Sequence, residues 1–252
     1  MPSRLFAALI LGFYSLILYS GCAGQRQTYF APSSIETLEY YPFQVKGYEN
    51  TYPKRRIEIL PAIDARDFKD TGGVDHDPSQ GHPAIGVITD QSAKIEQRLY
   101  GPPLDTMVQG AVARAAGEAG LVATQTPLGL KPALAARDAD YLLATKITRL
   151  WLDRHRGPDN QAGETWFAAA AVGLEVAIYK PPFDVPFWQG ESSATYDDPP
   201  APGGGQNATE DETPIYDQPG QELSVALTRA VAGVFKRESL RVLITQDSAA
   251  RR

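Results

Sequence analysis

The stretch 165–180 places the strongest constraint on the fold. Apolar side chains recur at every second position from Trp166 to Ile178, which is the period of a β-strand with one buried face. The alternate positions include Gly173, Glu175 and three alanines. The stretch therefore predicts a long strand that is buried on one side. The face of the strand that carries the small residues predicts either a tight internal packing seam or the close approach of another element.

Further strands are predicted on both sides of this stretch. Residues 140–154 and 185–196 have strand composition and short links to it, so the three should form an antiparallel meander. Residues 55–64 alternate as a first strand. Residues 84–89 and 93–100 are predicted to pair as a hairpin.

Two segments have the apolar spacing of amphipathic helices. The first follows Gly101-Pro102-Pro103, runs from Leu104 to Ala119 and meets Gly120 at the position after the helix end. The second covers residues 221–237, and residues 239–245 either extend it or add a strand. A short strand at 121–126 follows the first helix, which predicts a right-handed crossover with parallel pairing of the two flanking strands.

Together these elements predict an α+β fold. We expect a two-layer sandwich, in which a mixed, mostly antiparallel sheet of about 4–6 strands carries two amphipathic helices on one face. The domain should span residues 53–246, with mobile loops at 69–83 and 197–220 and a tail at 247–252.

The start of the chain has the layout of a secretory signal. Arg4 precedes an uncharged apolar run, which ends in Ser20-Gly21 and then Cys22, the only cysteine. This arrangement resembles a bacterial lipoprotein signal. The resemblance implies that residues 1–21 are removed and that Cys22 becomes the first residue, with acyl chains such as palmitate attached. Residues 22–52 would then be a tether, which becomes ordered towards its end, near Tyr40-Tyr41-Pro42-Phe43.

Two other interpretations of this segment stay open. A membrane-spanning helix needs about 20 apolar residues, and this run has about 15. Ordinary cleavage after Ala23 would remove Cys22 with the signal.

Tyr19 stands at a position where lipoprotein signals usually carry leucine. In enteric bacteria an aspartate after the cysteine favours the inner membrane, so Ala23 favours the outer membrane by the same resemblance.

Composition excludes several classes of function. The net charge is −6 and no face rich in lysine or arginine is evident, so a nucleic-acid partner is not expected. Attraction to anionic lipid headgroups is also unsupported, and membrane attachment would depend on the acyl chains. With one cysteine, no disulfide or thiol chemistry is expected after Cys22 is lipidated.

No segment predicts a catalytic, metal or cofactor site. Asp75-His76-Asp77 and His82 are suitable metal ligands by type, but their spacing matches no helix-borne pair. Residues 190–194 approach the nucleophile-elbow pattern, yet they are predicted to continue a strand. Residues 203–205 are a glycine triplet without the Lys-Ser/Thr of a phosphate loop. The three tryptophans are predicted to pack in the core or on a sheet face.

Several short motifs, in order, resemble the YajG-like group of bacterial outer-membrane lipoproteins and the wider set of small periplasmic α+β lipoprotein domains. The resemblance covers residues 55–240. The motifs are Asp64-Ala65-Arg66, Ile85-Gly86, Ala119-Gly120, Ala139-Asp140-Tyr141 and Trp188-Gln189-Gly190. It implies a non-enzymatic envelope protein, and it transfers no functional residue other than Cys22.

These observations predict a lipid-anchored, non-catalytic lipoprotein of the bacterial outer membrane, which faces the periplasm and binds an envelope partner protein. The alternative is an accessory lipoprotein of a lipid or organic-solvent ABC transport system that binds a lipid-like ligand. A hydrolase is the third hypothesis. The sequence leaves the oligomeric state and the partner open.

Overall fold

The computed structural model describes residue 40 and residues 45–67, 83–127, 139–156, 166–197 and 220–250. These residues belong to one compact unit that spans Ile35–Arg252. The lipoprotein signal, most of the predicted tether and most of both predicted loops lie outside the described residues.

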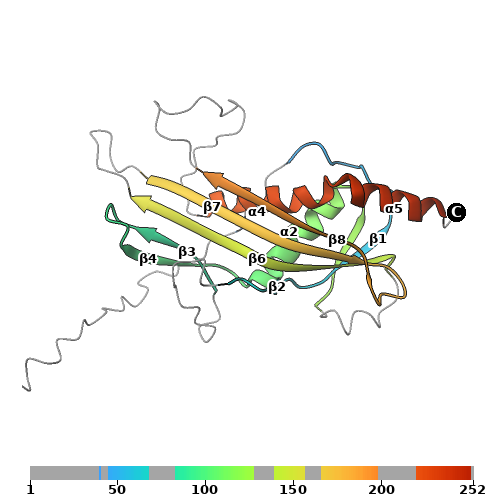
Figure 1. The fold of residues 1–252 in the computed structure, drawn as a ribbon, viewed down its shortest axis with the longest axis horizontal. Helices are drawn as coiled ribbons and strands as arrows, with labels where there is room; N and C mark the ends of the chain where they lie inside the picture. The colour runs from blue at the N-terminus through green and yellow to red at the C-terminus, as the bar shows by residue number, and fades with distance from the viewer. Residues whose placement is uncertain are drawn as a thin grey trace, which may run out of the picture. The chain divides into compact units, whose positions relative to one another are not determined.

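Three long strands form the main part of the sheet (Figure 1). They are β6 (Tyr141–Arg156), β7 (Trp166–Tyr179) and β8 (Pro186–Asp197). β7 pairs antiparallel with both neighbours, as the predicted meander requires. Side chains at even positions of β7, from Ala168 to Ile178, are buried, which confirms the alternation seen in the sequence.

The other edge of β6 pairs with three shorter strands in succession. β1 (Arg56–Ile59), β2 (Ile63–Asp64) and β3 (Ala84–Thr89) all run parallel to it. β4 (Ile95–Tyr100) completes the predicted hairpin with β3. β5 (Val122–Gln125) pairs in parallel with β1. Parallel pairing after the first helix is therefore correct, but the partner is β1 and not the strand directly before the helix.

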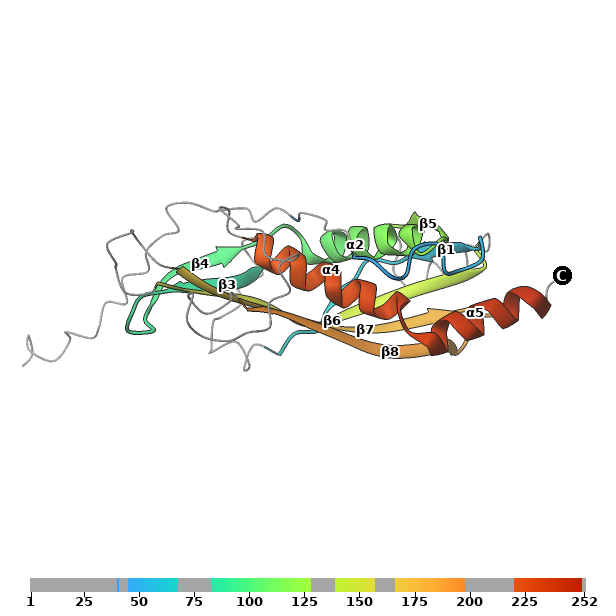
Figure 2. The same cartoon turned by 90° about the horizontal axis from the view of Figure 1, so that it is seen from above.

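Two helices cover one face of this sheet (Figure 2). α2 (Leu104–Glu118) and α4 (Gln221–Phe235) begin and end close to the predicted limits. Their apolar stripes join one core with the buried faces of β6, β7 and β8. Fully buried members include Val108, Ala226, Leu150 and Ile178. Burial of apolar side chains from both layers is the main stabilising contribution.

A third helix, α5 (Glu238–Ala250), follows α4. It continues to the end of the described chain, so residues 247–250 are helical, and the predicted tail at 247–252 was too long. Leu240 and Ile244 are its fully buried anchors. Ser239 accepts a hydrogen bond from Trp188 Nε1 at 3.1 Å, which holds the start of the helix against β8.

The predicted α+β two-layer class is confirmed. The sheet is larger than expected, with eight strands among the described residues against about four to six predicted. The predicted first strand at 55–64 is divided into β1 and β2, of four and two residues, whereas β5 matches the short strand predicted at 121–126. The described part also contains three helices, where two were predicted.

Two motif glycines are required where chain segments approach closely. Gly120 follows α2 with φ of +105°, and a Cβ there would lie 2.8 Å from the carbonyl oxygen of Tyr52. At Gly86 in β3 a Cβ would lie 2.1 Å from the carbonyl oxygen of Leu152 in β6. Both positions therefore exclude other residues for reasons of packing, and their place in the family-like motifs reflects the fold.

The Asp64-Ala65-Arg66 motif is also structural. The Arg66 side chain is 1% exposed and forms an ion pair with Asp64 at 2.8 Å. Its Nη1 donates to the carbonyl oxygens of Ala84 at 2.8 Å and Leu150 at 3.1 Å. One guanidinium thus joins the end of β2 to β3 and β6.

Candidate functional site

The domain has a defined attachment point for the predicted tether, although Cys22 lies outside the described residues. Residues 45–52 lie against the helix layer, and Tyr48 and Tyr52 are part of the core. The predicted tether at 22–52 is therefore too long at its end, because these last residues pack on the domain. We call residues 45–52, together with Tyr40, the strap.

Backbone and side-chain bonds hold the strap to the ends of both helices. Asn50 and Tyr52 donate their backbone N–H groups to the carbonyl oxygens of Glu118 and Ala119, each at 2.9 Å. The Tyr52 hydroxyl donates to the carbonyl oxygen of Phe235 at 2.8 Å, and the two rings meet edge to face at 6.2 Å. These bonds satisfy carbonyl groups at the ends of α2 and α4 that have no partner within the helix.

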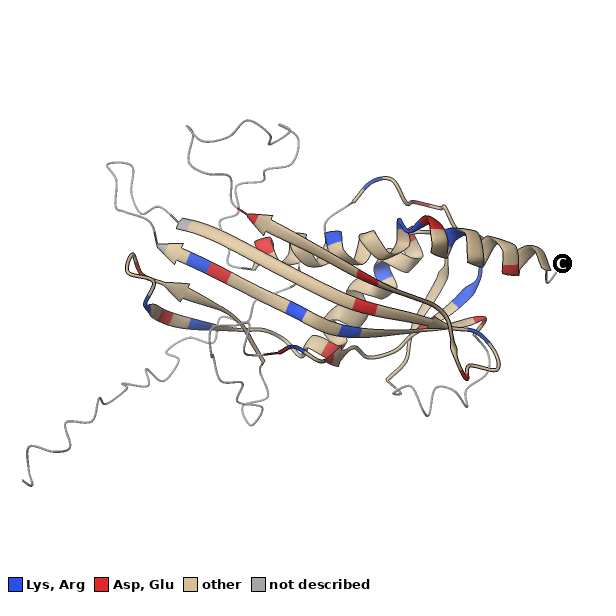
Figure 3. Cartoon of the chain, in the orientation of Figure 1, with Lys and Arg blue, Asp and Glu red and all other residues tan. Residues whose placement is uncertain are grey.

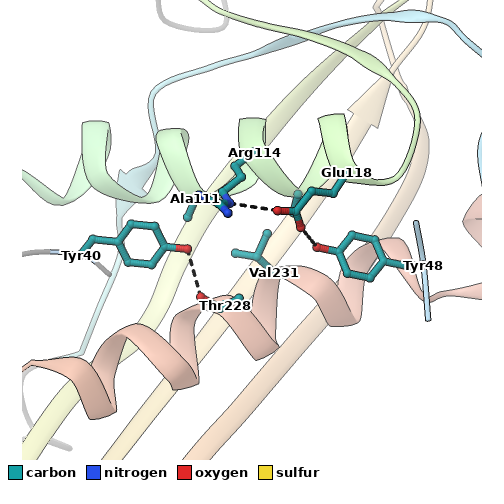
Figure 4. A pocket seen from close by; sticks show the side chains of 8 residues that line it. Tyr40, Tyr48, Ala111, Arg114, Glu118, Thr228 and Val231 are labelled. Carbon is teal, nitrogen blue, oxygen red and sulfur yellow. Dashed lines mark hydrogen bonds and ion pairs between the residues drawn. The ribbon is translucent and has the colours of Figure 1, made fainter. Parts of the chain in front are cut away.

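Figure 4 shows a polar cluster where the strap crosses α2. The Tyr48 hydroxyl donates to one carboxylate oxygen of Glu118, and Arg114 Nε donates to the other at 2.9 Å. On the neighbouring side the hydroxyls of Tyr40 and Thr228 lie 3.0 Å apart, within hydrogen-bond distance. The strap is thus bonded to α2 at one point and to α4 at another.

A small pocket lies among these residues, between the helices and the strap. It is lined by Tyr40, Tyr48, Ala111, Arg114, Ala115, Glu118, Thr228 and Val231. Its volume of about 10 Å³ corresponds to about one water molecule. An acyl chain or a drug-sized ligand does not fit, so the cluster serves attachment of the strap rather than ligand binding.

The strap predicts a loss of stability at alkaline pH. Burial, and then the hydrogen bond to the Glu118 carboxylate, raise the pKa of Tyr48 well above its ordinary value of 10.0. Burial also raises the pKa of Tyr52 above its ordinary value. A group whose pKa is raised by folding adds stability that is complete below the ordinary pKa and is lost as the pH rises through the folded pKa. The free energy of unfolding should therefore fall above about pH 10.

Urea unfolding of the wild type and of Tyr48→Phe/Tyr52→Phe between pH 8 and 11 tests this. The variant should have a shallower decline with pH. At pH 8, Tyr48→Phe alone should cost about 1–2 kcal/mol through the lost hydrogen bond. Equal slopes for the two proteins would contradict the assignment of the alkaline decline to the strap.

The opposite side of the sheet carries the second candidate surface. We define the open face as the side of β6, β7 and β8 that points away from α2 and α4. Its middle strand contributes small side chains, including Ala169, Ala171, Gly173 and Ala177. The small residues of the sequence are thus divided, since Ala168 and Ala170 are buried against the helices.

Charged residues lie on all three of these strands (Figure 3). Lys146 on β6 pairs with Glu175 on β7 at 3.3 Å. Glu175 is in turn directly opposite Glu191 on β8. Two like charges in directly opposed positions destabilise a sheet, so Glu191 has an unfavourable neighbour across the β7–β8 ladder.

The structure also locates the residues that the sequence analysis considered for chemistry. Residues 190–194 continue β8, as predicted, and the Ser192 hydroxyl donates to the carbonyl oxygen of Ala230 at 2.6 Å. Trp151 and Trp188 are buried in strands, as predicted. Residues 75–77, His82 and residues 203–205 lie outside the described residues.

Within the described ranges, no group of three or more His, Cys, Asp or Glu side chains is arranged to hold a metal ion. None of the helices described is long and apolar enough to cross a membrane.

Comparison with known proteins yields similarity of structure alone. No family model and no curated protein matches the sequence. Protein XCC0632 from Xanthomonas campestris, assigned to the family DUF330, is 11% identical with a TM-score of 0.45, over 86% of this chain and 99% of its own. The PelC dodecamer from Paraburkholderia phytofirmans is 9% identical with a TM-score of 0.35, over 72% and 86%.

Lipoprotein GNA1162 from Neisseria meningitidis is also similar in structure. It is 11% identical with a TM-score of 0.23, over 58% of this chain and 85% of its own. The similar structures thus include a bacterial lipoprotein. At these identities and TM-scores the similarities carry no information about function, and the resemblance to the YajG-like group stays a prediction.

Proposed function

We propose that this chain is a lipid-anchored, non-catalytic cell-envelope lipoprotein, held at the outer membrane and facing the periplasm, which binds a partner protein. The observation that carries the proposal is the uncharged run that ends in the only cysteine, Cys22. Stable attachment needs more than one acyl chain, and the several chains of a mature lipoprotein meet that need.

The strap is consistent with this role. Tyr40 lies 18 positions after Cys22, so a fully extended tether reaches at most about 60 Å. Because the strap is bonded to α2 and α4, tension on the tether acts on the helix layer. The open face lies on the other side of the sheet and is the surface that we assign to the partner.

The described pocket at the strap gives no support to a lipid-like ligand, so we propose a protein partner. A ligand with acyl chains would need an apolar cavity of some 300–1,000 Å³, whereas the pocket at the strap has about 10 Å³. Mass spectrometry of the purified protein distinguishes the two, because a stoichiometric lipid other than the anchor would favour the transport-accessory alternative.

Lipidation is tested with the Cys22→Ala variant and with Ala23→Ser as the matched control. In the wild type and the control, the N-terminal peptide should begin at Cys22 and carry the mass of the acyl chains. Both proteins should fractionate with the outer membrane. Cys22→Ala should be unprocessed or soluble. A cleaved Cys22→Ala protein in the outer-membrane fraction, or a mature wild-type chain that begins at Gly24, would contradict the proposal.

A further inference from the structure

The outer edge of β8 has the properties of a binding site for an extended protein segment. β8 has 12 residues and, within the described sheet, pairs only with β7. Its other edge therefore presents backbone groups without a strand partner. Such an edge accepts an added strand through main-chain hydrogen bonds, while neighbouring side chains select the sequence.

The direction of these backbone groups follows from one side-chain contact. Arg237 Nη2 donates to the carbonyl oxygen of Glu191 at 2.5 Å, so this carbonyl points away from β7 and already has a hydrogen-bond partner. N–H and C=O directions alternate along a strand together with the side chains. The β7–β8 register is unbroken from Trp188 to Asp197, and the backbone groups of Ser193 and Thr195 therefore point to the same free edge.

The side chains of these residues share the open face. Glu191, Ser193, Thr195 and Asp197 are all exposed, and they form one row along the edge. The row has a carboxylate at each end, six positions apart, and hydroxyls between them. No ion pair of Glu191 or Asp197 occurs within the described residues, and Glu191 faces Glu175 across the ladder.

These features select one kind of occupant. We propose that the β8 edge binds an extended segment of the partner protein, which adds to the sheet as a further strand through main-chain hydrogen bonds to Ser193 and Thr195. This segment has basic side chains six positions apart, which face Glu191 and Asp197. Each cation would face one carboxylate of the row. Opposite charges in neighbouring strands stabilise a sheet, and the cation next to Glu191 would offset its repulsion from Glu175.

A second copy of this chain fits the edge less well. Pairing of β8 with β8 would bring two rows with carboxylates and no cations side by side. The charge of the row therefore opposes self-association through this edge and favours a basic partner. The proposal deepens the proposed function, since it names the chemistry of the partner and the part of the surface that it occupies.

Binding of two synthetic peptides to the mature full-length protein in detergent tests the proposal. The basic peptide is Lys-Val-Ser-Val-Thr-Val-Lys, and the acidic peptide has Glu at both ends. The wild type should bind the basic peptide at least tenfold more tightly. Amide exchange of Ser193 and Thr195 should become slower in the complex, as new main-chain hydrogen bonds require.

A charge-reversal variant provides the decisive comparison. Glu191→Lys/Asp197→Lys should reverse the preference, so that the acidic peptide binds more tightly, whereas Glu96→Lys on β4 should leave it unchanged. Both substituted carboxylates are exposed, so the variant should fold, which circular dichroism verifies. Equal binding of both peptides by the wild type, or an unchanged preference in the variant, would overturn the proposal.

Two further outcomes separate this inference from others. A dimer that cross-links through Ser193→Cys would assign the edge to a second copy and overturn the proposal. Because the peptides report on the edge whether or not Cys22 is lipidated, failure of peptide binding in a protein with the expected lipid would leave the proposed anchoring intact. If Cys22 is not lipidated but the basic peptide binds specifically, the proposed anchoring fails and the proposal for the β8 edge stands.

Discussion

Arg66→Met is expected to lower the free energy of unfolding by about 3–5 kcal/mol, because it removes a buried guanidinium that donates to two carbonyl oxygens and pairs with the partly exposed carboxylate of Asp64. The Arg66 guanidinium is nearly inaccessible to water, with a side chain 1% exposed. Its removal leaves the carbonyl oxygens of Ala84 and Leu150 without this donor. Each buried polar group that loses its hydrogen bond costs about 1–3 kcal/mol.

Chemical denaturation of Arg66→Met and of Arg56→Met measures this effect. Arg56 is exposed on β1, so the control should change stability by less than about 0.5 kcal/mol. Arg66→Lys should be intermediate, because an ammonium retains the charge but lacks the planar fork of donors. If Arg66→Met is as stable as the control, the junction of β2, β3 and β6 does not depend on this side chain.

This junction shows where sequence reasoning reached its limit. The alternation in β7 and the apolar stripes of α2 and α4 are local patterns, and they were sufficient to predict these three elements and the α+β class. Arg66 bonds to Ala84 and Leu150, which are distant in sequence. The Asp64-Ala65-Arg66 motif contains no information about these two carbonyl partners. Its role in joining β2 to β3 and β6 was therefore not predictable from the sequence.

The pairing of β5 has the same explanation. Gln109 of α2 donates from Nε2 to the carbonyl oxygens of Ile59 and Thr126, both at 2.7 Å. This buried amide joins the ends of β1 and β5 through the helix between them. A glutamine in an amphipathic helix gives no sign that it is buried, and the parallel pairing of two four-residue strands depends on such long-range contacts.

The candidate surfaces were predictable only in part. The small residues of β7 indicated a face suited to close approach, and the structure shows that Ala169, Ala171, Gly173 and Ala177 lie on the open face, whereas Ala168 and Ala170 are buried on the helix side. The strap was assigned to the tether because residues 45–52 have no sustained period. Its tyrosines are buried by contacts with α2 and α4, and a pattern search within one segment does not detect packing against another.

Glu222→Leu is expected to have the second large effect, also about 3–5 kcal/mol. Glu222 is 2% exposed, and its Oε1 lies 3.3 Å from Arg154 Nη2 of β6. Its Oε2 accepts the backbone N–H of Gly220 at 3.1 Å, which satisfies a donor at the start of α4. The carboxylate also lies in the first turn, where a negative charge interacts favourably with the helix dipole.

The double variant Arg154→Met/Glu222→Leu separates the ion pair from its surroundings. When both charges are replaced by apolar groups of similar volume, the desolvation cost of the pair also disappears. The double variant should therefore recover most of the stability lost in Glu222→Leu, with a coupling energy of about 2–3 kcal/mol in the double-mutant cycle. Glu175→Leu is the matched control, since the Lys146–Glu175 pair is exposed and should contribute less than about 1 kcal/mol. Additive losses in the cycle would mean that Glu222 stabilises α4 only through its cap and the helix dipole.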